Sequence, residues 1–112
     1  MKSLNEASQQ IKDFSEARDW SQFHDPKNLA LSLSLESSEV LELFQWTKDN
    51  KINPKKMSEL PDELADVFYW LIMISNHYDI DLLESLNNKM QKNIEKYPID
   101  KAKGTPRKYN EL

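Results

Sequence analysis

Four acidic residues stand out in this 112-residue chain because they occupy otherwise apolar segments. They are Glu36, Glu39, Glu63 and Asp66. They form two pairs, each spaced i, i+3, which on a helix places the members side by side, with about 5–6 Å between Cβ atoms. No Lys or Arg lies between residues 29 and 47 to neutralise the first pair. Because clustered carboxylates repel one another, and because Mg²⁺ and Mn²⁺ prefer oxygen ligands, we predict a divalent cation site.

Three other interpretations of the acids stay open at this point. In the first, the four acids are ordinary solvated surface carboxylates, as single i, i+3 pairs usually are. In the second, they belong to a non-catalytic helical interaction module. A di-iron carboxylate bundle also places acids inside helices, but it typically uses Glu-x-x-His pairs. Neither His24 nor His77 follows a Glu by three residues.

The segments that position the acids are predicted to be helices, giving an all-α fold of four helices. The chain contains a single Gly, which disfavours an all-β fold rich in tight turns. Ser3 to Glu6 fits a capping box, so a first helix is expected to run to about Trp20. Asp25-Pro26 has the N-cap and N1 residues of a second helix, which nothing breaks before Asp49-Asn50.

Two further helices complete the predicted bundle. Ser58 is the expected cap of the third helix, with Pro61 in its first turn, where a missing N–H is tolerated. Asp79 to Asp81 starts the fourth helix, and Pro98 stops it. The third helix is apolar almost all round from Leu64 to Ile74, which is typical of a helix buried on more than one side. We therefore predict that a partner subunit covers this helix and completes the bundle.

Length and composition indicate one domain over residues 1–112, with a flexible basic tail at about 100–112. The net charge of −4 disfavours general nucleic-acid binding, although residues 89–108 are locally basic. There is no Cys, no signal-peptide pattern and no run of 18 apolar residues. We expect a cytoplasmic protein that does not enter membranes.

Beyond these patterns, nearly the whole chain resembles one enzyme family. The matching motifs are RDWSQFHDPKNLALSL, the E-S-S-E pair followed by ELFQW, the E-L-A-D pair, and KMQKNIEKYPIDKAKGTPRKYNEL. They resemble the MazG-like all-α nucleoside triphosphate pyrophosphohydrolases, especially the short single-domain branch like dCTP pyrophosphatase. The resemblance implies that the four acids hold Mg²⁺ and that a nucleoside triphosphate is cleaved to its monophosphate and pyrophosphate. It also implies helical dimers or dimers of dimers.

Further residues have expected roles in this reaction. One carboxylate or a metal-bound hydroxide is expected to orient and deprotonate the attacking water, and Glu39 is the carboxylate that we predict. The resemblance implies the substrate-binding residues Trp20, His24, Trp46, Trp70, Asn93, Lys96 and Tyr97, with the tryptophans at the base and the last three at the triphosphate or sugar. The chain has Trp70 where many dCTP-selective relatives have Tyr, and it lacks their His near Ile11. The preferred base, dCTP or a modified nucleotide, therefore stays open.

Overall fold

The computed structural model describes residues 1–112 and contains helices but no strands, which confirms the predicted all-α fold. The chain divides into two compact units, residues 1–79 and 80–112. The first unit contains α1 (Leu4–Ala17), η1 (Ser21–Phe23), α2 (Pro26–Glu42), η2 (Pro54–Glu59) and α3 (Leu60–His77). The second contains α4 (Leu82–Lys96), α5 (Ile99–Ala102) and η3 (Tyr109–Glu111). None of these helices has the length and apolar character needed to cross a membrane.

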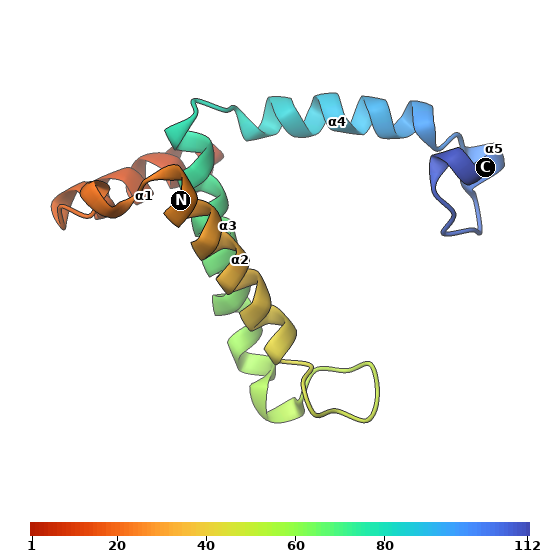
Figure 1. The fold of residues 1–112 in the computed structure, drawn as a ribbon, viewed down its shortest axis with the longest axis horizontal. Helices are drawn as coiled ribbons and strands as arrows, with labels where there is room; N and C mark the ends of the chain where they lie inside the picture. Colours follow the sequence, from red (N-terminus) through yellow and green to blue (C-terminus); the bar gives the residue numbers. More distant parts are fainter. The chain divides into compact units, whose positions relative to one another are not determined.

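The first unit is organised around the antiparallel pair of α2 and α3, which lie side by side along their lengths (Figure 1). Leu29 from α2 and Ile72 from α3 are its most fully buried large side chains. Helix α1 packs against α3, and its buried Ala7 and Ser15 are small. Small side chains allow two helix axes to approach closely. The core is therefore modest, and it consists mainly of the contacts that hold the three helices together.

The start of α2 agrees with the prediction, but its end does not. The Asp25 side chain accepts a hydrogen bond from the Asn28 backbone N–H at 2.8 Å, as an N-cap does. The helix ends at Glu42 instead of continuing to residue 48. The Thr47 hydroxyl donates to the Phe44 carbonyl at 2.8 Å and so supports the turn that follows the helix.

The start of α3 also differs from the prediction in one respect. Asn53 caps a 3-10 helix, η2, by accepting from the Lys55 backbone N–H, and Ser58 lies inside that element instead of capping α3. Pro61 lies in the first turn of α3, as expected, together with Asp62 and Glu63. Acidic side chains at this end interact favourably with the helix dipole.

The predicted capping box of α1 is half correct. Ser3 accepts from the Glu6 backbone N–H at 3.1 Å. The Glu6 carboxylate does not return the bond to Ser3 but accepts from the Lys2 backbone N–H at 3.0 Å. Both bonds still satisfy backbone donors at the helix start.

The second unit begins where the sequence indicated. Asp81 caps α4 by accepting from the Glu84 backbone N–H at 3.1 Å. The segment after Pro98 contains the one-turn α5 and the 3-10 helix η3. The single-domain organisation and the flexibility of residues 100–112 stay predictions.

Candidate metal centre

The four acidic side chains come together between α2 and α3. One carboxylate oxygen from each lies within 4.8 Å of the others. Glu36 and Glu39 come from α2, and Glu63 and Asp66 come from α3. Because the two helices run antiparallel in contact, two i, i+3 pairs face each other across the helix interface. Glu36, Glu39 and Glu63 are partly buried, and Asp66 is exposed.

The electrostatics of the cluster disfavour four negative charges. A hydrogen bond with Glu39, burial, and the charges of Glu39, Asp66 and Glu36 raise the pKa of Glu63 from 4.5 to about 7. Burial, and then the neighbouring Glu39, raise the pKa of Glu36. The Trp70 side chain acts in the opposite direction: it lowers the pKa of Glu36 and so favours the anion. Glu39 is a neighbour of both Glu36 and Glu63 and raises the pKa of each.

The donor atoms fit a hard divalent cation. One oxygen of Glu36 and one of Glu63 are buried without any hydrogen-bond partner. Buried polar atoms without partners are costly, so each calls for an explanation. Residues 28–47 and 57–88 contain no Lys or Arg that would supply the counter-charge from within these helices. An all-oxygen set of four carboxylates can therefore hold a metal ion such as Mg²⁺, Mn²⁺ or Ca²⁺.

An aromatic cavity of about 500 Å³ adjoins the acids. It is lined by Met1, Gln10, Ile11, Phe14, Trp20, Glu36, Asp66, Tyr69 and Trp70. Its aromatic rings form a chain of edge-to-face contacts, from Trp20 to Phe14 at 5.5 Å, on to Tyr69 at 6.3 Å, and then to Trp70 at 5.1 Å between centroids. Glu36 and Asp66 thus belong both to the acidic cluster and to the wall of an apolar cavity.

The C-terminal end of α1 places Trp20 in that wall. Asp19 adopts a positive φ of 54°, which Asp tolerates better than most residues. The Trp20 backbone N–H donates to the Ser15 carbonyl, and the Asp19 N–H donates to the Glu16 carbonyl. This is the hydrogen-bond pattern of a Schellman motif, in which the chain reverses directly after the helix. The reversal brings the Trp20 ring back against Phe14.

The other predicted site residues lie in different surroundings. Trp46 follows α2, is 91% exposed, has a φ of 67° and does not line the aromatic cavity. Asn93, Lys96 and Tyr97 belong to the second unit, where Tyr97 and the Lys96 ammonium both contact the Tyr109 ring. The substrate-binding roles of these four residues stay predictions.

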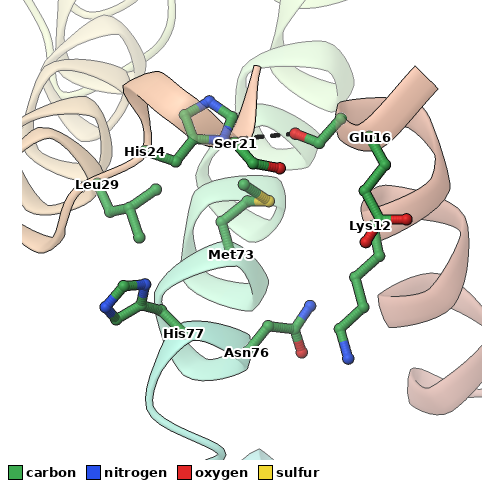
Figure 2. A pocket seen from close by; sticks show the side chains of 9 residues that line it. Lys12, Glu16, Ser21, His24, Leu29, Met73, Asn76 and His77 are labelled. Atoms are coloured by element: carbon green, nitrogen blue, oxygen red, sulfur yellow. Dashed lines mark hydrogen bonds between the residues drawn. The ribbon is translucent and has the colours of Figure 1, made fainter. Parts of the chain in front are cut away.

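His24 lines a second, smaller cavity instead of the aromatic one. This cavity measures about 260 Å³ and is bounded by α1, η1 and the C-terminal half of α3. Figure 2 shows His24 and Ser21 on one side, Asn76 and His77 on the other, and Met73 between them. The Nδ1 atom of His24 lies 3.4 Å from the Ser15 hydroxyl (Figure 2, dashed line). The edge-to-face contact of the His24 ring with Trp70, at 5.6 Å between centroids, connects this region to the aromatic cavity.

Phe14 and Tyr69 are cavity residues that the sequence analysis did not assign to the site. The signal for Tyr69 is its spacing, because it follows Asp66 by three residues, as Trp70 does by four, and therefore shares its helix face. Phe14 had no such signal. Its place depends on the packing of α1 against α3, which spacing within one helix does not specify.

Comparisons with known proteins agree with this geometry. The MazG-like family matches residues 31–112. The chain is 37% identical over 105 residues to mouse dCTP pyrophosphatase 1 and 38% identical over 105 residues to the human protein of that name. Each alignment covers 89% of this chain but only 62% of the relative, so the chain spans less than two thirds of these curated proteins. A pyrophosphatase crystal structure from Archaeoglobus fulgidus superimposes with a TM-score of 0.79 and 35% identity, covering 85% of this chain and 92% of that one.

The raised pKa of Glu63 predicts how the stability of the metal-free protein depends on pH. Between 4.5, its ordinary pKa, and about 7, its folded value, the folded protein keeps a proton that the unfolded chain releases. Protonation of Glu63 relieves the repulsion in the folded protein. The resulting contribution to the free energy of unfolding is fully present below pH 4.5 and is lost as the pH rises through about 7. Glu63→Gln should therefore gain thermal stability over the parent progressively across this interval, measured in EDTA.

Glu59→Gln is the matched control, because it removes an exposed acid outside the cluster, one turn earlier in the chain. Its melting temperature should follow that of the parent at every pH. A difference in melting temperature between Glu63→Gln and the parent that stays the same at every pH would contradict the electrostatic account.

Proposed function

This chain belongs to the MazG-like family, and on that premise we propose that it is an Mg²⁺-dependent nucleoside triphosphate pyrophosphohydrolase. The reaction would convert a nucleoside triphosphate and water to the monophosphate and pyrophosphate, in the cytoplasm.

The observation that carries the proposal is the junction of two unlike surfaces. A carboxylate cluster with unpartnered buried oxygens meets a cavity walled by aromatic rings, and Glu36 and Asp66 belong to both. A metal at the acids would attract a polyphosphate, while aromatic rings stack on a nucleobase. A cavity of about 500 Å³ is within the range of small-molecule sites. A nucleoside triphosphate is a ligand that satisfies both surfaces at once.

The mechanism assigns roles to the acids. Glu36, Glu39, Glu63 and Asp66 would hold Mg²⁺, which neutralises phosphate charge and the charge that develops in the transition state. Glu39 is the proposed general base, because it is the acid that neighbours both Glu36 and Glu63. It would accept a proton from water as the water oxygen attacks the α-phosphorus. The bond between the α-phosphorus and the bridging oxygen then breaks, and pyrophosphate leaves.

Substrate binding is proposed for aromatic and polar side chains. Trp20 and Trp70 would contact the base inside the aromatic cavity. Trp46 does not line this cavity, and its proposed contact with the base would be a separate one. Asn93, Lys96 and Tyr97 would bind the triphosphate or sugar. The names of the mammalian relatives make dCTP the first substrate to test. Ile11 and Trp70 line the cavity at the two positions where the sequence departs from many dCTP-selective enzymes, so modified nucleotides belong in the same panel.

The enzyme is further proposed to act as a homodimer or homotetramer. Helix α3 exposes Leu64, Phe68 and Leu71 at helical spacing, and α2 exposes Leu31 and Leu35. The Phe68 side chain is 47% exposed, although it lies in the middle of the most apolar helix. Large exposed apolar stripes of this kind mark association surfaces. A second copy of the chain would cover them and add to the modest core.

The first prediction from this function concerns the products. With dCTP and Mg²⁺, ³¹P NMR should show the monophosphate and pyrophosphate appearing together, because attack occurs at the α-phosphorus. EDTA should stop the reaction. A panel of canonical and modified triphosphates extends the assay if dCTP is a poor substrate. Formation of a nucleoside diphosphate and orthophosphate would contradict the proposed reaction.

The second prediction concerns assembly. Sedimentation at micromolar concentration should show at least a dimer for the parent. Phe68→Asp should shift the population toward monomer, because a charge would be buried in the association surface. Ile99→Asp is the control, since Ile99 is an exposed apolar residue of the second unit and should leave the mass unchanged. A stable, well-folded parent monomer would exclude the proposed assembly.

A further inference from the structure

His24 occupies a position that its expected role as a substrate-binding residue does not explain. It does not line the aromatic cavity; its Nδ1 faces the Ser15 hydroxyl at 3.4 Å in the smaller cavity. Ser15 is only 3% exposed and comes from α1, so it is a fixed partner. The two residues lie nine positions apart and are brought together by the chain reversal after α1.

Trp70 lies between His24 and the metal centre. The His24 and Trp70 rings meet edge-to-face, with their planes at 90°. Trp70 and Glu36, one of the four acids, line the same aromatic cavity, and the Trp70 side chain lowers the pKa of Glu36. An indole has one N–H donor, so the rotation of the ring decides whether that N–H faces Glu36. Tyr69 contacts the same indole and, with His24, restricts its rotation.

We propose that His24 is a positioning residue: held by the buried Ser15, it fixes the Trp70 indole so that the indole N–H points at Glu36. His24 then acts on the reaction without touching the nucleotide. Glu36 has one buried oxygen without a partner, and orienting its other oxygen would direct the free one toward the cation. Groups that orient metal ligands in this way commonly change metal affinity or activity by about 10–100-fold when removed.

The first test is spectroscopic and does not depend on activity. A ¹⁵N-labelled sample of the full chain should give an indole N–H signal for each of Trp20, Trp46 and Trp70, and Trp70→Phe identifies the third. His24→Ala should shift the Trp70 signal in the direction produced by Glu36→Gln, and it should leave the Trp46 signal in place. His77→Ala is the control, because His77 lines the same small cavity but its ring contacts Tyr78. An unmoved Trp70 signal in His24→Ala, or an equal shift in His77→Ala, would overturn the proposal.

A second pair of variants keeps the test valid if His24→Ala does not fold. His24→Phe retains a ring against Trp70 and loses the nitrogen that faces Ser15, and Ser15→Ala loses the other side of the same contact. Each should shift the Trp70 signal, and the double variant should shift it no further. Additive shifts would show that Ser15 and His24 act independently, contrary to the proposal.

The kinetic test rests on the proposed function. His24→Ala should lower kcat/KM about tenfold in the parent and have almost no effect in a Trp70→Phe background, since a positioning residue acts only through what it positions. A tenfold loss that persists in Trp70→Phe would show that His24 acts on the substrate directly. If no triphosphate is hydrolysed, the proposed function fails while the indole signals still decide the role of His24.

Discussion

The repulsion among four carboxylates is the constraint on which this structure depends. One oxygen of each carboxylate lies within 4.8 Å of the others, and three of the four acids are partly buried. The segments that carry them, residues 28–47 and 57–88, contain no Lys or Arg. In the absence of a cation, protonation reduces the charge of the cluster, as the raised pKa values of Glu36 and Glu63 reflect. A bound cation removes this penalty. A cluster that destabilises the folded protein when no cation is bound is characteristic of a functional site, because such sites are commonly less stable than the rest of a protein.

Helix α3 links the acids to the rest of the site. Glu63, Asp66 and Trp70 follow one another at spacings of three and four, so a single helix face carries two acids and then an aromatic wall. The antiparallel α2 brings Glu36 opposite this face. The reversal at the end of α1 then closes the aromatic cavity with Trp20 and places His24 behind Trp70. Charge and aromatic surface are adjacent because one helix supplies part of both.

The features that depend on spacing within one helix could be predicted from the sequence. Most features that depend on the packing of different helices could not. The i, i+3 acids, the Asp25 and Asp81 caps and the tolerated Pro61 follow from local geometry, and all appear in the structure. The end of α2 was missed because no Gly or Pro marks it, and the turn is instead stabilised by the Thr47 hydroxyl. Phe14 and the Ser15–His24 contact were missed because they require the relative placement of α1 and α3. The part of Asn93 in the site is still a prediction, because it depends on the placement of a separate unit.

The most direct test of the central claim compares glutamine substitutions at Glu39 and at Glu42, three residues further along the chain. Thermal melting without metal, the increase in melting temperature on adding Mg²⁺, and Mg²⁺-dependent turnover would be measured for each. Glu39→Gln should be at least as stable as the parent without metal, because one like charge has been removed. It should gain less from Mg²⁺, since ligand binding stabilises the folded state, and it should lose most of its turnover. Glu42→Gln should match the parent in all three. Full Mg²⁺ response and turnover in Glu39→Gln, or equal losses in Glu42→Gln, would contradict a single cation site formed by these four acids.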